Sequence, residues 1–181
     1  MDRKCIEALE AEHKTMLRIA DVLDAMANKV AEQSEYNTHD VEAIFHILRS
    51  FGDELHQAKE EGALFPVFTR LCDSSEFAAV RHMIFEHEQD RSLMSGMADA
   101  ISRSNAPQFA EYAARLANIL RNHIFKEDNI LFEMIGARLS EEDDKAIIKE
   151  FEFFDQDFHA RHEKLMDTLH SLEWKYLRRI A

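Results

Sequence analysis

Two short segments of the chain carry the same pair of side chains at the same spacing. His56 precedes Glu60 in HQAKEEGALF, and His123 precedes Glu127 in HIFKEDNILF. Because residues four apart lie on one face of an α-helix, each imidazole and its carboxylate can point at the same spot. Nitrogen and oxygen ligands of this kind suit iron, manganese or zinc. Each segment is therefore predicted to supply two ligands to a metal site.

The residues that flank these two pairs make the prediction specific. The same spacing recurs where His82 precedes Glu86 and where His159 precedes Glu163. Neither of these two segments has the Lys-Glu and Leu-Phe residues that follow the histidine in both segments described above. Spacing alone is weak evidence, whereas the matching flanks favour a metal site.

Two further histidines, His13 and His87, are predicted to lie at the same height as these pairs. At a rise of ~1.5 Å per residue, His13 lies about as far before the end of its predicted helix as His56 lies after the start of the next. The same comparison brings His87 level with Glu60 and with His123 to within about one helical turn. Imidazoles and carboxylates gathered in one buried layer destabilise a protein unless they have partners, and a metal supplies them.

The elements that position these residues are predicted to be long helices. Apolar residues recur at helical spacing along most of the chain, and short polar stretches interrupt the pattern. Pro66 predicts a bend or an early end in the second helix, and Gly136 predicts the end of the fourth. The predicted helices cover about residues 3–31, 38–72, 76–103, 107–135 and 140–178.

The loops between the predicted helices are short, which favours antiparallel neighbours. The chain has 181 residues, of which 46% are hydrophobic, so one domain with a substantial core is expected. We predict an all-α fold in a single domain spanning residues 1–181. It consists of an up-down-up-down antiparallel four-helix bundle at about residues 3–137 and an additional C-terminal helix at about residues 140–178.

The charge and the cysteines limit the partners and the compartment of the protein. A formal net charge of −13 argues against binding to nucleic acid or to an anionic membrane surface. No apolar run reaches the ~18 residues of a membrane span, and the N-terminal residues lack the pattern of a signal peptide. Cys5 and Cys72 form no metal-type pair. We expect a cytoplasmic protein, and its oligomeric state stays open.

Four segments resemble the hemerythrin-like HHE cation-binding family over about residues 5–135. The stretch from Phe51 to Pro66 is similar to that family's second-helix signature, and the stretch from Asn122 to Phe132 is similar to its fourth-helix signature. EH in the first helix and EHEQDR in the third resemble the remaining two. The resemblance implies an oxo- or hydroxo-bridged pair of non-haem iron ions, with manganese or zinc as alternatives, and two bridging glutamates. The ligands that it implies are His13, His56, Glu60, His87, His123 and Glu127.

The sequence departs from the oxygen-carrying members of that family at two positions. Those proteins have His-x-x-x-His on the third helix, whereas here Arg91 stands four residues after His87. Many relatives also have a His-His doublet on the second helix, where this chain has His56 followed by Gln57. A site with fewer histidines leaves more positions open to water, peroxide, oxygen or nitric oxide. A reactive or sensing centre is therefore favoured over an oxygen carrier.

Several neighbouring side chains are left as alternatives. Asp90, Glu61 or Asp128 could supply an additional ligand, and Asp128 competes with Glu127 because oxygen-carrying hemerythrins use a carboxylate at its spacing. His162 in the fifth helix is predicted to lie about two turns from the metal layer, unless that helix bends. Acidic residues next to the predicted ligands could also orient the imidazoles; these are Glu12, Glu86 and Asp90.

These observations predict a non-haem di-iron protein that binds, reduces or senses a small oxidant such as oxygen, peroxide or nitric oxide. Whether it turns over as an enzyme stays open. One alternative is an iron-binding sensor or interaction module without turnover. Another is ferritin-like iron handling, which is disfavoured because the Glu-x-x-His pattern that it requires occurs only from Glu10 to His13.

Overall fold

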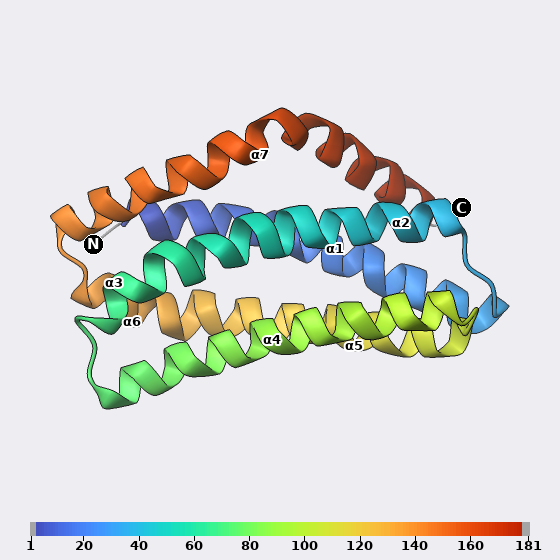
Figure 1. Cartoon of the computed structure of the whole chain (residues 1–181), viewed down its shortest axis with the longest axis horizontal. Coiled ribbons are helices and arrows are strands. Elements are labelled where there is room, and N and C mark those ends of the chain that lie inside the picture. The colour runs from blue at the N-terminus through green and yellow to red at the C-terminus, as the bar shows by residue number, and fades with distance from the viewer. Residues whose placement is uncertain (1–2, 179–181) are drawn as a thin grey trace.

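The computed structural model describes residues 3–178, and within that range the fold is entirely helical, without strands. Four helical rods run antiparallel to one another and a fifth lies across two of them (Figure 1). The predicted all-α bundle with an additional C-terminal helix is confirmed, and the predicted helix ends agree with the observed ones to within three residues. The first three rods are α1 (Lys4–Gln33), residues 38–69, and α4 (Ser74–Ser102); the fourth covers residues 106–138, and the fifth is α7 (Glu141–Tyr176).

Local capping explains where several of these helices begin. The Asp73 side chain accepts hydrogen bonds from N–H groups in the first turn of α4, and the Glu76 side chain accepts one from the backbone N–H of Asp73. Ser140 and Asp143 form the same reciprocal arrangement at the start of α7. Such pairs satisfy backbone N–H groups that have no partner within the helix.

The second and fourth rods change their helical geometry where they carry the predicted ligands. Both contain π-helical turns, which are wider than α-helical turns and often occur at functional sites. The second rod comprises α2 (Thr38–Ile47), the π segments η1 (Leu48–Gln57) and η2 (Glu60–Leu64), and α3 (Phe65–Thr69). The fourth comprises α5 (Ala106–Lys126), the π segment η3 (Glu127–Leu131) and α6 (Phe132–Arg138).

Neither Pro66 nor Gly136 is the last residue of its helix. Pro66 lies in the first turn of α3, where the rod continues to Thr69. The prediction that Gly136 ends the fourth helix is wrong, because α6 continues to Arg138. A Cβ at Gly136 would lie 3.3 Å from Cδ1 of Ile6, so the glycine permits close packing against α1.

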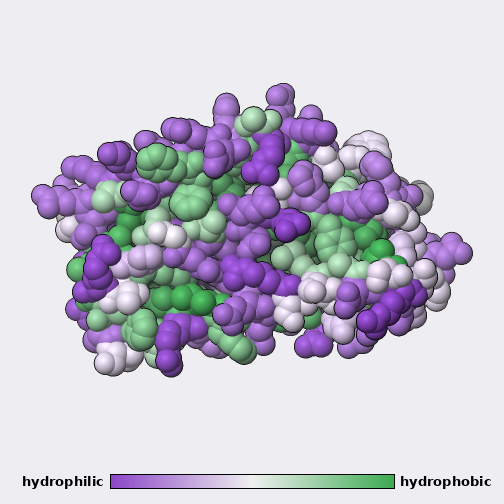
Figure 2. Space-filling model, viewed as in Figure 1, coloured by the Kyte–Doolittle hydropathy of each residue, from purple (hydrophilic) through white to green (hydrophobic). Residues whose placement is uncertain are grey.

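The buried apolar residues of the described chain form two clusters with a polar layer between them. On α1, for example, Leu9 belongs to one cluster, Met16 to the other, and His13 lies between them. On the face shown in Figure 2, polar side chains dominate and apolar ones gather in separate patches. Within residues 3–178, no helix combines the length and apolar character needed to cross a membrane. The fold therefore places its most unusual buried groups in one layer at mid-height.

Candidate metal centre

The six predicted ligands lie together in this buried layer. Each is at most 3% exposed. Their nitrogen and oxygen atoms form two groups, in each of which all ligand atoms lie within 4.8 Å of one another. Both groups contain the same two glutamates. One group is His13, His56, Glu60 and Glu127, and the other is Glu60, His87, His123 and Glu127.

The distances within the groups suit two neighbouring metal ions. The Nε2 atoms of His13 and His56 are 3.0 Å apart, and those of His87 and His123 are 3.1 Å apart. Two ligands bound at ~2.1 Å from one ion, at right angles, lie ~3.0 Å apart. Oε2 of Glu127 lies 3.2 Å from Nε2 of His13 and 3.1 Å from Nε2 of His123, so this carboxylate reaches both histidine pairs.

Glu60 reaches both pairs in the same way. Its Oε1 is 3.8 Å from Nε2 of His56, and its Oε2 is 3.3 Å from Nε2 of His87. Glu60 and Glu127 are both completely buried, and their four carboxylate oxygens accept no hydrogen bond from the described residues. Buried carboxylates without partners are costly, whereas a cation between them would neutralise their charge. The residues present therefore fit a metal site.

The other ring nitrogen of every histidine in the layer hydrogen-bonds a carboxylate. A carboxylate only accepts, so Nδ1 carries the proton and Nε2 of the neutral ring is free to bind a metal. Because the hydrogen bond from Nδ1 to the carboxylate holds each ring in place, the Nε2 lone pair has a fixed direction. The pairs are His13 with Asp128 (2.6 Å), His56 with Glu12 (2.9 Å), His87 with Glu61 (2.7 Å) and His123 with Glu86 (3.0 Å).

Three of these four carboxylates are held in turn by a cation. Nζ of Lys59 lies 2.5 Å from Oε1 of Glu12, and Lys126 donates to Glu86. Nη2 of Arg91 lies 2.6 Å from Oε1 of Glu61. Charge-assisted hydrogen bonds of this kind are stronger than neutral ones, so they stiffen the support of the histidines.

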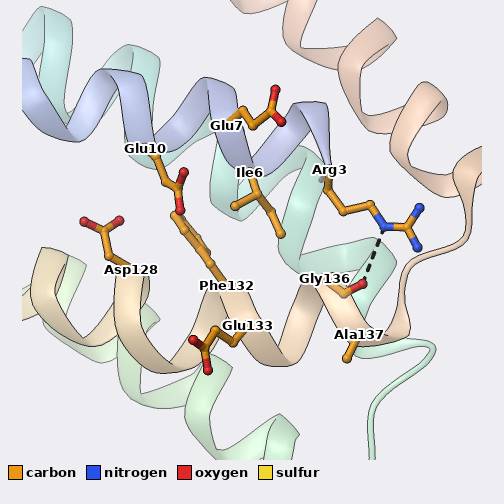
Figure 3. A pocket seen from close by; sticks show the side chains of 9 residues that line it. All are labelled: Arg3, Ile6, Glu7, Glu10, Asp128, Phe132, Glu133, Gly136 and Ala137. Atoms are coloured by element: carbon orange, nitrogen blue, oxygen red, sulfur yellow. Dashed lines mark hydrogen bonds between the residues drawn. The ribbon is translucent and has the colours of Figure 1, made fainter. Parts of the chain in front are cut away.

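Asp128, the fourth carboxylate, has no Lys or Arg partner among the described residues and is 34% exposed. It lines a surface pocket of about 500 Å³ between α1 and the helix of η3 and α6. In Figure 3, Glu10 and Asp128 lie at one end of this pocket, and Arg3 bonds to the Gly136 carbonyl at the other. Solvent thus comes within one side chain of His13 on this face.

The carboxylates shift the pKa values of the histidines. Burial acts to lower the pKa of His13, but its hydrogen bond with Asp128 and the negative charge of Glu127 raise it to about 9. Burial likewise opposes protonation of His87, and Glu60 and Glu61 raise its pKa to about 9. The metal-free layer is therefore negative enough to hold protons at neutral pH, and a metal ion would compete with them.

The same contacts occur in both halves of the bundle. In each half a His-x-x-Lys-Glu segment supplies a histidine, the lysine three residues later, and a glutamate that faces the layer. The lysine holds the glutamate that orients that same histidine: Glu12 for His56, and Glu86 for His123. Each of these glutamates also directly precedes another candidate ligand: Glu12 precedes His13, and Glu86 precedes His87. The shared Lys-Glu flanks of the sequence therefore reflect a shared supporting structure.

The structure places the remaining alternatives outside the two groups. Asp128 and Glu61 contact the Nδ1 atoms of His13 and His87, on the side of each imidazole that faces away from the two ligand groups. Asp90 is 2% exposed, and burial raises its pKa to about 7, although a cation nearby would favour the ionised form. Figure 1 shows that α7 does bend, yet His162 is exposed and packs edge-on against Phe158.

The family model of the hemerythrin HHE cation-binding domain, which describes sequences, matches residues 5–135 of this chain. The chain belongs to this family. The resemblance inferred from the four sequence segments is thereby confirmed. No curated protein matches the chain. Family membership and the buried His/Glu cluster together indicate a metal site.

Arg91 and α7 both lie next to the candidate metal centre without supplying a ligand to it. Arg91, at the position of a histidine in oxygen-carrying hemerythrins, is 36% exposed and pairs with Asp53 and Glu61, so it supports His87 from outside the layer. The helix α7 lies beyond the matched residues and packs against α1 and the second rod. Sequence reasoning identified Glu12 and Glu86 as possible orienting groups but assigned no role to Lys59 or Lys126.

Proposed function

We propose that this HHE domain holds a non-haem di-iron centre that binds and reduces, or senses, a small oxidant such as oxygen, peroxide or nitric oxide. The observation that carries the proposal is the pair of His₂Glu₂ groups that share both glutamates. One group would hold the first iron and the other group the second, with both glutamates common to the two groups. The proposed ligands are His13, His56, Glu60, His87, His123 and Glu127.

The protein side chains have distinct tasks in this proposal. Glu60 and Glu127 would hold the metal ions and balance their charge. The carboxylates on Nδ1 fix the direction of the imidazoles and raise their basicity. Phe132 stacks on His13 with ring centroids 5.4 Å apart, and Phe65 stacks on His87 at 6.2 Å, so apolar rings cover the layer from one side.

Four protein ligands per ion leave coordination positions open. An iron pair supplies open positions and redox electrons for a small oxidant. The nitrogen and oxygen ligands also suit manganese or zinc, so metal content decides between these ions. The proposed partner is a small gaseous or peroxide molecule, without nucleic acid or membrane. We place the protein in the cytoplasm, because neither Cys5 nor Cys72 is in a disulfide.

An iron-binding sensor without turnover is the second candidate, and one contact favours it. Lys59 joins Glu12, which orients His56, to Asp155 on α7. If a change in the metal state moved His56, the contacts through Glu12 and Lys59 would transmit that movement to α7, which lies on the outside of the bundle. Turnover with an added oxidant separates the two candidates.

The proposal is tested by loading the protein with ferrous iron under anaerobic conditions and then adding oxygen or peroxide. The near-ultraviolet absorption of a bridged ferric pair should appear, and His56→Ala should not develop it. Absence of this absorption in iron-loaded wild-type protein would contradict the di-iron proposal. A visible band that appears and disappears reversibly with oxygen pressure would instead indicate oxygen carriage.

A further inference from the structure

The two ligand groups of the candidate metal centre are supported by matching contacts. The His13 group contains His13 and His56, and the His87 group contains His87 and His123. In each group, one histidine is oriented by a glutamate that a lysine holds. The other histidine, His13 or His87, stacks on a phenylalanine and bonds the carboxylate that directly follows a ligand glutamate. Corresponding contacts of the two groups can therefore be compared one by one.

The carboxylates that orient His13 and His87 differ in one respect. These carboxylates are Asp128 and Glu61, and their side chains are exposed to nearly the same extent, 34% and 31%. Glu61 accepts a hydrogen bond from Arg91, whereas no lysine or arginine in residues 3–178 bonds Asp128. A charge-assisted hydrogen bond restrains the carboxylate that accepts it. Glu61 therefore holds His87 more firmly than Asp128 holds His13.

A single sequence position accounts for this difference. Arg91 lies four residues after His87 on α4, and residues four apart are neighbours on one helix face, so its guanidinium reaches Glu61. The corresponding position on α1, four residues after His13, is Leu17. Leu17 is partly buried and packs against the larger apolar cluster. An apolar side chain cannot pair with a carboxylate, so the His13 group lacks the cation that the His87 group has.

A surface pocket reaches the less firmly held histidine. Asp128 lines the pocket of about 500 Å³ between α1 and the helix of η3 and α6 (Figure 3). Phe132, which stacks on His13, lines the same pocket. Carboxylates outnumber basic side chains around it, and negative charge attracts cations from solvent. The pocket therefore brings solvent to both side chains that hold His13 from outside the metal layer.

We propose that the ion of the His13 group exchanges with solvent through the pocket lined by Asp128, while the ion of the His87 group stays bound. A residue that orients a ligand imidazole contributes to metal affinity, so the weaker hold on His13 lets its ion leave more readily. Arg91 and Glu61 together hold His87 in its binding orientation. The inference rests on the proposed two-ion centre and distinguishes an exchangeable ion from a retained one.

The test follows the release of zinc from zinc-loaded protein into an excess of a coloured chelator. Zinc suits the nitrogen and oxygen ligands and undergoes no redox reaction, so only ion release is measured. Wild type should release its ions in two phases of equal amplitude, and the first should be about tenfold faster than the second. Release of two zinc ions in a single phase would overturn the inference and leave the metal centre intact.

Two substitutions assign the phases to the ligand groups. Arg91→Leu removes the cation beside Glu61 and should accelerate the slow phase toward the fast one, without changing the fast phase. Leu17→Arg supplies a cation beside Asp128 and should slow the fast phase toward the slow one. Because Leu17 is partly buried, Arg91→Leu decides alone if Leu17→Arg folds poorly. An Arg91→Leu protein that accelerates the fast phase, or neither phase, would overturn the assignment.

Asn28→Arg is the matched control for added positive charge, since Asn28 is exposed near the end of α1 and away from His13. It should release zinc as wild type does. If it slowed the fast phase as much as Leu17→Arg does, net charge rather than the contact with Asp128 would set the rate, and the inference would be wrong. Wild-type protein that binds no metal, or a single zinc, would overturn the proposed two-ion centre and this inference together.

Discussion

Nζ of Lys59 lies 2.5 Å from Oδ1 of Asp155, which joins α7 to the support of the candidate metal centre. Lys59 is only 2% exposed, and its ammonium also bonds Glu12, the carboxylate that orients His56. A buried lysine needs such partners. The helix α7, which lies outside the family match, therefore contributes to the surroundings of the ligand group that contains His56.

Removing Asp155 should weaken this arrangement. Asp155→Ala leaves Lys59 with one carboxylate, and because Asp155 is 56% exposed we expect a loss of about 1–2 kcal/mol in the free energy of unfolding. Urea unfolding of the metal-loaded protein measures this. Asp157→Ala, at an exposed position two residues along the same helix, is the control and should change little. Equal stability of the two variants would show that the contact with α7 is unimportant.

The orienting glutamates should control metal affinity in both ligand groups. Glu12→Gln and Glu86→Gln weaken the hold on His56 and His123, and each should reduce metal affinity by about 10- to 100-fold. Competition with a chelator of known affinity measures the change. Glu10→Gln alters an exposed residue on the same helix as Glu12 and should bind metal as wild type does. Wild-type affinity in both orienting variants would refute the supporting role.

The stability of the metal-free protein should fall as the pH rises from neutral. Carboxylates raise the pKa of His13 and His87 to about 9 in the folded state, against 6.5 for the unperturbed group. The resulting stabilisation is fully present below about pH 6.5 and is lost as the pH rises through about 9. Urea unfolding of chelator-treated protein across this window should show the decline.

The affinity for metal should rise with pH, whereas the stability of the metal-free protein falls. Because bound metal displaces protons from the imidazoles, metal affinity should rise with pH over this window, with release of protons to an unbuffered solution. A flat stability profile in metal-free protein, or metal binding without proton release, would contradict the assigned protonation.

The convergence of the six candidate ligands could be predicted from the sequence because it depends largely on helical geometry. The spacing of His56 and Glu60 fixes their common face, and rise per residue fixes the height of His13 and His87. The π segments shift these heights slightly, but the loops are short enough to keep the errors within about a turn. The resemblance to the HHE family supplied the ligand set.

The supporting contacts could not be predicted because they depend on how helices face one another. The pairing of Glu12 with His56 joins two helices, so it depends on their rotation about their axes. The burial of Lys59 depends on α7, whose position the helical periodicity does not fix. The fourth helix was predicted to end at Gly136, whereas it continues to Arg138, because that glycine serves close packing against Ile6, a contact distant in sequence.

Metal content per chain tests the central claim most directly, on protein purified without chelators or metal-binding tags. Wild type should contain about two irons per chain, and His56→Ala should lose at least one. His162→Ala, which alters an exposed histidine on α7, should keep the wild-type content. No metal or a single zinc in wild type, or equal loss in both variants, would contradict the account.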